Sequence, residues 1–208
     1  MIAVVGWPRS GTHWMKAMLE STLGEEFAHD HSCPGVEGIQ YVLLVRDPRD
    51  AFASHWRLYQ KDYPGQSTEL GFIDLFLKGG MESHHNWNIG WVPHTRKLLE
   101  WNERHTSSAS LVRYEQMYAT PEKVLEEVLA RLGRRDVSKG RIAEAVRETQ
   151  GRRCDPSDLK ADSDMGRPGK WRAQLRDSTV RALIEYCGSE MVELGYLSRE
   201  ERAKWRRA

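Results

Sequence analysis

Three short, largely apolar runs constrain the fold of this chain, because each is followed by a loop and then by apolar residues at helical spacing. The runs are Ile2–Val5, Tyr41–Val45 and Ala109–Val112. Apolar runs of this length are typical of strands buried on both faces, as in a parallel sheet. Strand, loop and helix in repeated order predict an α/β fold. We therefore expect three layers, with a central parallel sheet of about four to five strands and helices on both faces.

The expected helices are delimited by residues that favour helix ends. Residues 13–23 carry apolar side chains at helical spacing, and Gly24 is placed to end that helix. The Asp-Pro pair at 47–48 and the Thr-Pro pair at 120–121 each provide a cap and a first-turn proline for a helix. Further helices are expected over residues 72–77, 92–102, 180–194 and 198–208, with a weaker one around Ile142 and Val146.

Length and charge limit the class of protein. The 208 residues fit a single domain over 1–208. Within it, residues 134–170 are largely polar, which predicts a loop or lid region that closes over the ligand. The 31 Lys and Arg residues nearly balance 30 Asp and Glu, for a net charge of +1. This balance argues against a protein that coats nucleic acid or an anionic membrane.

Cysteine and histidine usage gives no sign of a metal centre. Cys33, Cys154 and Cys187 form neither a CxxC pair nor a metal-ligand spacing, and the pair His84-His85 has no third ligand at such a spacing. Unpaired thiols are typical of a reducing compartment. Because the chain also lacks a run of about 18 apolar residues and a signal-peptide pattern, we expect a cytoplasmic protein without a membrane span.

The loop after the first expected strand has the glycine spacing of a phosphate-binding loop. Gly6 and Gly11 are separated by four residues, and the backbone N–H groups of such a loop, together with the following helix N-terminus, suit an anion. A nucleotide-triphosphate loop continues with Lys and then Ser or Thr, but Thr12 and His13 stand here. The loop is thus expected to bind phosphate without the usual Mg²⁺-triphosphate machinery. A merely structural strand–helix turn is the alternative.

Residues 8–14, PRSGTHW, resemble the loop PKSGTTW that holds the 5′-phosphosulfate in sulfotransferases dependent on 3′-phosphoadenosine 5′-phosphosulfate (PAPS). Arg9 replaces the family lysine and His13 replaces its second threonine. The resemblance implies a sulfotransferase fold similar to that of P-loop nucleotidases, with this loop bound to the donor. The donor-binding residues that it implies are Arg9, Ser10, Gly11, Thr12, His13 and Trp14, with the tryptophan against the adenine.

The nine residues that begin at Arg46 read RDPRDAFAS and resemble the second family signature, RNPKDVAVS. The resemblance implies that Arg46 and Ser54 hold the 3′-phosphate of the donor. An ion pair of Arg46 with Asp47 or Asp50 is the alternative. Asp50 and also His55 are otherwise assigned to the helix surface or to supporting positions.

Two later segments extend the resemblance over nearly the whole chain. Residues 112–117, VRYEQM, are similar to the YEDM segment of the family, which implies that Tyr114 approaches the adenine. Residues 166–171, GRPGKW, resemble the loop RKGxxGxW that closes over the 3′-phosphate, although the basic pair before its first glycine is missing. This loop adds Gly166, Arg167 and Gly169 to the implied donor-binding residues.

The resemblance implies sulfuryl transfer from PAPS to a hydroxyl or amine, with 3′-phosphoadenosine 5′-phosphate (PAP) as product and no metal. A loose, in-line transition state is expected by analogy with phosphoryl transfer, so Arg9 and the loop N–H groups would stabilise charge on the leaving phosphate. The acceptor must lose a proton to a general base, and histidine titrates near neutrality. Aligned with the family segment Lys-Thr-His, His31 is the expected base and His29 replaces the lysine. The alternative bases are His13, Asp30 and Glu20.

Two other functions remain open from the sequence. One is a nucleotide kinase that uses ATP, against which the missing loop lysine argues. The other is an inactive module that binds a 3′-phosphonucleotide or an anionic glycan. The acceptor, whether a small molecule, a glycan or a lipid, is not determined by the motifs, because one fold serves many acceptors.

Overall fold

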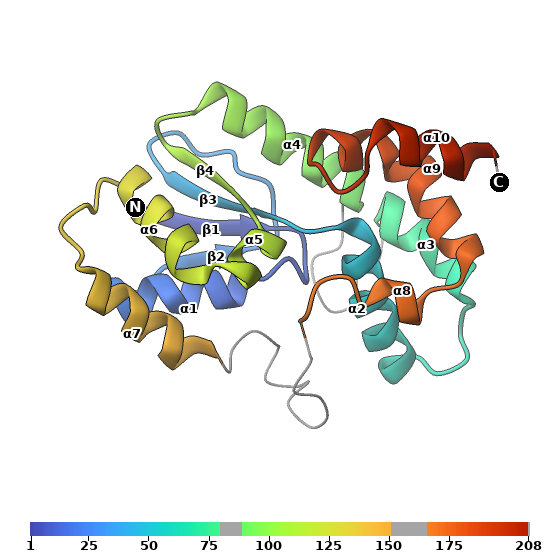
Figure 1. Cartoon of the computed structure of the whole chain (residues 1–208), viewed down its shortest axis with the longest axis horizontal. Coiled ribbons are helices and arrows are strands. Elements are labelled where there is room, and N and C mark those ends of the chain that lie inside the picture. Colours follow the sequence, from blue (N-terminus) through green and yellow to red (C-terminus); the bar gives the residue numbers. More distant parts are fainter. Residues whose placement is uncertain (80–88, 151–165, 208) are drawn as a thin grey trace. The chain divides into compact units, whose positions relative to one another are not determined.

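The computed structural model describes residues 1–79, 89–150 and 166–207 and divides into two compact units (Figure 1). The sheet unit comprises Met1–Arg46 and Lys97–Arg167, and the helical unit comprises Asp47–Arg96 and Pro168–Ala208. A single domain over 1–208 stays a prediction.

The sheet unit is built on four parallel strands in the order β2-β1-β3-β4. Their bounds are Ile2–Gly6 for β1, Ala28–Asp30 for β2, Gln40–Val45 for β3 and Ala109–Arg113 for β4. Three of them are the apolar runs of the sequence, and β2 is a short edge strand beside β1. The predicted α/β fold with a central parallel sheet is confirmed.

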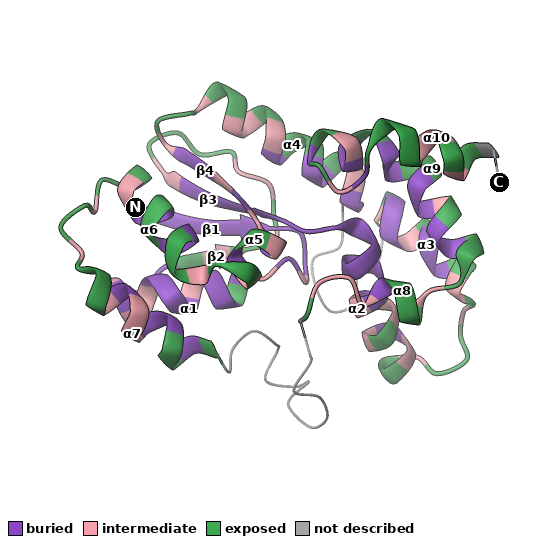
Figure 2. Ribbon diagram, viewed as in Figure 1, coloured by how far each residue is buried: buried purple, intermediate pink, exposed green. Residues whose placement is uncertain are grey.

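Helices cover both faces of this sheet, as predicted (Figure 1). They are α1 (Thr12–Leu23), α5 (Tyr114–Ala119), α6 (Pro121–Arg131), α7 (Lys139–Thr149) and the second half of α4 (Trp91–Arg104). Val4 and Val42 point to one face and join a core cluster with residues of α1, α6 and α7. Tyr41 points to the other face, where its ring lies edge-on to Trp101 of α4 at 5.5 Å. Alternate strand residues therefore serve two separate cores, as the strand period of two requires. Figure 2 shows β1, β3 and β4 as largely buried.

One predicted helix end agrees with the structure, whereas a predicted helix cap and a predicted loop differ from it. Gly24 ends α1 with a φ of 68°, a left-handed conformation that glycine adopts without steric cost. Thr120 does not cap α6, because its hydroxyl donates to the Gln116 carbonyl in the preceding turn. The range 134–170, predicted as a loop or lid, contains the helix α7, whose buried Ile142 and Val146 had predicted a weak helix there. The rest of the predicted lid falls largely on residues 151–165, outside the described residues.

The helical unit contains α2 (Pro48–Asp62), α3 (Glu69–Lys78), α8 (Trp171–Gln174), α9 (Asp177–Glu193), α10 (Arg199–Arg207) and the first half of α4. Its core is aromatic. The Phe52 ring lies 5.4 Å from that of Phe72 and 5.3 Å from that of Phe76. In the part of the chain that the structure describes, none of the helices has both the length and the apolar character needed to cross a membrane.

Candidate active site

The loop between β1 and α1 has the shape of an anion-binding turn. Ser10 N–H donates to the Trp7 carbonyl over 3.1 Å, and the chain then enters α1 through Gly11 at a φ of 89°. Arg9 also has a positive φ, 69°, which an L-residue rarely adopts. Such a conformation costs on the order of 1–3 kcal/mol and persists where function requires it. Strained backbone of this kind is concentrated at functional sites, which favours the anion-binding interpretation over a plain strand–helix connection.

The N-terminus of α1 is open to an anion. Gly11 has no side chain to cap the helix, and the first turn contains no acidic residue. The first N–H groups of a helix have no partner within the helix, and the helix dipole favours negative charge there. A phosphate or sulfonate group could satisfy them.

Two glycines keep this loop close to its neighbours. A Cβ on Gly11 would lie 2.5 Å from Cδ2 of Tyr114, and one on Gly6 would lie 2.8 Å from the Leu44 carbonyl oxygen. Neither position has room for a larger residue. Packing thus requires glycine at both positions, and at Gly11 the backbone conformation requires it as well.

Arg46 follows β3 and reaches the same loop. Its Nη1 donates to the Arg9 carbonyl over 2.9 Å, and its guanidinium lies over the Tyr114 ring, 4.3 Å from the centroid. Arg46 Nε and Ser10 Oγ are buried without a hydrogen-bond partner. Buried polar atoms left in this state are costly unless a ligand or water satisfies them. The two atoms therefore fit an anionic ligand at the loop.

Tyr114 connects the loop to the segment at 166. It is buried, its hydroxyl donates to the Gly166 carbonyl over 2.7 Å, and its ring lies edge-on to Trp14 at 6.4 Å. Trp14 has no exposed surface and belongs to the core of the sheet unit. Its predicted contact with the adenine stays a prediction, as does the donor contact of the exposed Arg167.

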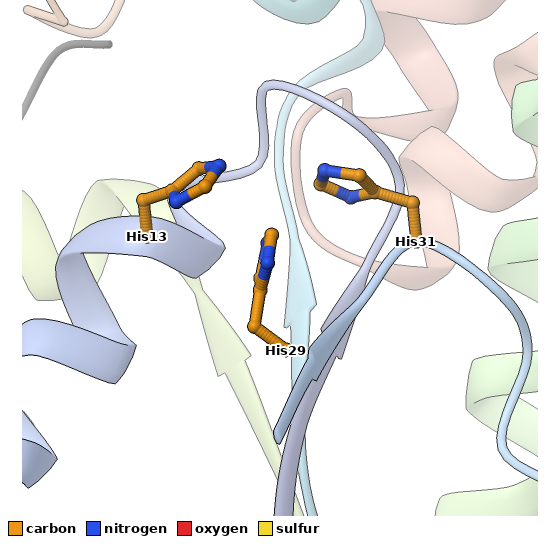
Figure 3. Close-up of side chains that lie close together, drawn as sticks. All are labelled: His13, His29 and His31. Atoms are coloured by element: carbon orange, nitrogen blue, oxygen red, sulfur yellow. The ribbon is translucent and has the colours of Figure 1, made fainter. Parts of the chain in front are cut away.

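Three histidines converge beside the loop (Figure 3). β2 pairs with β1 so that Val4 lies opposite His29 and Val5 opposite Asp30, which brings His31 to the level of Gly6. Nδ1 of His31 accordingly lies 2.8 Å from the Gly6 carbonyl oxygen. His13, in the first turn of α1, has its ring centroid 4.1 Å from that of His29. The sequence predicts a role for each histidine, but it does not predict that the three form one cluster.

The hydrogen bond of His31 identifies which of its ring nitrogens bears a proton when the ring is neutral. A carbonyl oxygen only accepts, so Nδ1 carries the proton and Nε2 is the basic nitrogen of the neutral ring. Burial, together with the nearby His13, His31 and Lys16, lowers the pKa of His29 to about 4 although Asp30 opposes the shift. His29 is therefore neutral at neutral pH, and its Nε2 lies 2.9 Å from the Thr12 hydroxyl.

The carboxylates proposed as alternative bases are engaged elsewhere. Burial raises the pKa of Asp30, but hydrogen bonds from Ser32 and from the His31 N–H outweigh it and leave that pKa lowered. Glu20 accepts from Phe27 N–H and pairs with Lys16 at 2.7 Å. Both are thus weaker candidates for a base than His31.

The remaining predicted residues lie in the helical unit. Asp47 caps α2 by accepting from Arg49 N–H, and its carboxylate also holds the Arg49 side chain at 2.7 Å. Asp50 accepts from Gly169 N–H at 2.6 Å and from Trp171 N–H at 3.0 Å. Asp50 thus holds the glycine segment 166–171 where it enters α8.

Two expectations for α2 need correction or remain untested. Asp50 and His55 were expected on the helix surface or in supporting positions, and both are buried, with 3% and 0% exposed surface. The surface assignment is wrong, because α2 packs against α3, α8 and α9 and has little free face.

Ser54 is half-buried on α2 and Arg46 belongs to the sheet unit, so their shared hold on one phosphate stays a prediction. The His84-His85 pair lies outside the described residues.

Solved structures with the same fold come from sulfotransferases and a related enzyme. Mouse sulfotransferase SULT7A1 complexed with PAP is 19% identical, with a TM-score of 0.72 over 99% of this chain and 87% of the mouse chain. Retinol dehydratase in complex with androsterone and inactive cofactor PAP is 14% identical, with a TM-score of 0.67 over 91% of this chain and 80% of its own. An Arabidopsis thaliana putative steroid sulphotransferase is 14% identical, with a TM-score of 0.61 over 91% and 75%.

Sequence comparison gives the family. No curated protein sequence matches the chain significantly. The family model of the sulfotransferase domain, however, matches residues 37–195, which is more than half of the chain. Together with the fold, this match confirms the predicted family and enzyme class: the chain belongs to the PAPS-dependent sulfotransferase family.

Proposed function

We propose that this enzyme transfers the sulfuryl group of PAPS to a hydroxyl or amine of a small-molecule acceptor, with His31 as general base and without a metal. The observation that carries the proposal is the uncapped N-terminus of α1, beside which Ser10 Oγ and Arg46 Nε are buried and unsatisfied. The mouse sulfotransferase and retinol dehydratase structures contain PAP, which supports the same nucleotide here.

The donor supplies an activated sulfuryl group and a phosphate leaving group, and the residues of the chain orient both. The N–H groups at the start of α1 and the Arg9 side chain would bind the 5′ end, where charge develops as the S–O bond breaks. Arg46 would bind the 3′-phosphate together with Ser54, and Tyr114 would contact the adenine. These assignments follow the family signatures and the burial of Arg46 and Tyr114.

Proton removal falls to His31. As the acceptor oxygen bonds to sulfur, its proton would pass to Nε2 of His31, while Nδ1–H stays on the Gly6 carbonyl and keeps the ring oriented. Replacement of His31 by Gln is expected to lower turnover by about 10²–10⁴-fold and to leave nucleotide binding intact. If His13 is the base instead, His13→Gln rather than His31→Gln will show that loss.

The proposed acceptor class comes from the solved relatives. The retinol dehydratase complexes contain androsterone and retinol, both small alcohols. A small-molecule alcohol is therefore the first acceptor class to screen, before glycans and lipids. A cytoplasmic location is part of the same proposal and is supported by the free thiols of Cys33 and Cys187.

Calorimetric titration of the full chain with PAP, AMP and ATP with Mg²⁺ tests the donor. We expect PAP to bind best, and Arg46→Ala to weaken it about 10–100-fold, since a charged hydrogen bond contributes about 1.5–3 kcal/mol. Arg104→Ala is the control, because that exposed arginine pairs only locally, with Glu100. Equal or better binding of ATP with Mg²⁺ would favour the kinase, and PAP binding without turnover by any acceptor would favour an inactive binding module.

A further inference from the structure

The cluster of His13, His29 and His31 has the composition of a metal site. One ligand nitrogen from each residue can be chosen so that all three lie within 4.8 Å of one another. The ring centroids of His29 and His31 are 4.8 Å apart, and those of His13 and His31 are 6.3 Å apart. Figure 3 shows the three imidazole rings facing a common space from α1, from β2 and from the residue after β2.

The hydrogen bonds of two rings orient them as in metal sites. A histidine that binds a metal almost always donates its other ring N–H to a carbonyl or carboxylate. Nδ1 of His31 makes this contact with the Gly6 carbonyl, which directs the basic Nε2 away from the backbone. Nε2 of His29 contacts the Thr12 hydroxyl, a group that can serve as donor or acceptor. The His31 ring is therefore held by the backbone of β1, and the His29 ring by a side chain of α1.

The electrostatics of the cluster also favour a cation. The Asp30 carboxylate adjoins the cluster in sequence and supplies a negative charge.

We propose that His13, His29 and His31 bind one divalent transition-metal ion of the Zn²⁺ class. Imidazole nitrogen is a preferred ligand of Zn²⁺, Cu²⁺ and Ni²⁺ and a poor one for Mg²⁺ and Ca²⁺. Three protein ligands leave the fourth tetrahedral position open to water or to an anion. With Zn–N bonds of about 2.0–2.1 Å, the nitrogens must approach to about 3.3 Å. His13 is the exposed member of the cluster, at the start of α1, so the adjustment is assigned to its side chain.

Metal binding opposes catalysis in this enzyme, a consequence that rests on the proposed function. The ion takes the Nε2 lone pair of His31 that would otherwise accept the proton of the acceptor. Sulfuryl transfer needs no metal, so an ion in the cluster inhibits turnover, and a chelator restores it.

Direct metal binding tests the site independently of turnover. Full-length protein stripped with a chelator would be titrated with Zn²⁺ against a chromogenic chelator, and with Co²⁺ by visible absorption. We expect one equivalent of Zn²⁺, the intense absorption of tetrahedral Co²⁺, and an affinity at least about 100-fold lower in His29→Ala and His13→Ala. The His13 variant serves because this exposed side chain can be removed without loss of the fold, which circular dichroism would verify.

Two control variants separate this cluster from other histidines. His105→Ala removes a histidine paired with Glu37, and a His84→Ala/His85→Ala double variant removes the adjacent pair outside the described residues. Both should bind Zn²⁺ as the parent protein does. Zn²⁺ affinity that is equal in the parent and in His13→Ala, or that is lost in the double variant, would overturn the proposal. PAP binding is measured separately, so its failure would count against the proposed function and not against the metal site.

Discussion

The N-termini of α1 and α2 show how one sequence treats two similar positions in opposite ways. Each helix begins shortly after a parallel strand, β1 or β3. The start of α1 has Gly11 in place of a capping side chain and no acid in its first turn. The start of α2 has the Asp47 cap, Pro48 and the acidic Asp50.

The N-terminus of α1 is the proposed binding site, whereas that of α2 supports neighbouring parts of its own unit. At α2 the Asp47 carboxylate caps the helix and holds the Arg49 side chain, and the two oxygens of Asp50, in the first turn, accept from Gly169 N–H and Trp171 N–H. At α1 the helix end offers its N–H groups to a ligand. Of these two helices, α1 is therefore the one whose N-terminus is proposed to bind an external anion, because no side chain of its own caps it.

We call the N-terminus of α2 the closed end, because Asp47 caps it, and the uncapped N-terminus of α1 the open end. The largest effect is expected from Asp47→Ala at the closed end. The change removes the cap of α2 and leaves the Arg49 guanidinium, with 6% exposed surface, without its carboxylate. Breaking a buried ion pair costs about 3–5 kcal/mol. Urea unfolding should show this loss, whereas Asp47→Asn, which keeps a capping oxygen, should lose less. Equal stability of Asp47→Ala and the parent would contradict the role given to the cap.

Gly11→Ala tests the open end. The new Cβ would meet the Tyr114 ring at 2.5 Å, and alanine at a φ of 89° is strained. We expect a loss of about 1–3 kcal/mol in stability and at least a tenfold loss in PAP affinity. Gly24→Ala is the matched control, because Gly24 has a φ of 68° but no atom within 4 Å of its added Cβ. That variant should lose stability alone, and PAP binding that falls equally in both would mean the loop is not the site.

The Asp47 carboxylate at the closed end also affects the Cys187 thiol. Burial, with the carboxylates of Glu190 and Asp47, raises the pKa of this thiol well above 9.0. The folded protein then keeps the thiol neutral while the unfolded chain ionises above that pH, so stability is lost as pH rises past about 9. The slope approaches 1.4 kcal/mol per pH unit for one proton. Thermal unfolding measured from about pH 8 to about pH 10.5, a range that spans the ordinary thiol pKa, should be less pH-dependent in Cys187→Ala than in the parent. Parallel curves would argue against a perturbed thiol.

The smallest effect on stability is expected from His13→Glu, which gives α1 the acid that α2 has. A carboxylate in the first turn stabilises a helix by about 0.3–1 kcal/mol. The same charge repels the phosphosulfate end of the donor. We expect Tm to rise slightly while PAP affinity falls, with His13→Gln as the uncharged control. A parallel change in both quantities would show that the two helix ends do not differ in the way described.

Much of this arrangement could be predicted from the sequence. Apolar runs placed β1, β3 and β4, because a strand buried on both faces has to be apolar throughout. The glycine spacing at 6–11 and the Asp-Pro pair at 47–48 identified the open and the closed helix ends through local backbone rules alone. The family followed from the same residues.

Tertiary contacts decided what local rules do not contain. The cluster of His13, His29 and His31 exists because β2 pairs with β1 in one register, which lines His31 up with Gly6. The sequence did contain one sign of the cluster: His29 and His31 are two residues apart, and alternate residues of a strand share a face. Burial of Asp50 likewise depends on α8, which lies 120 or so positions later in the chain. Local patterns in the sequence predicted three of the four strands and most of the longer helices, because these depend on near neighbours, whereas pairing and packing between distant segments decided which side chains share a site.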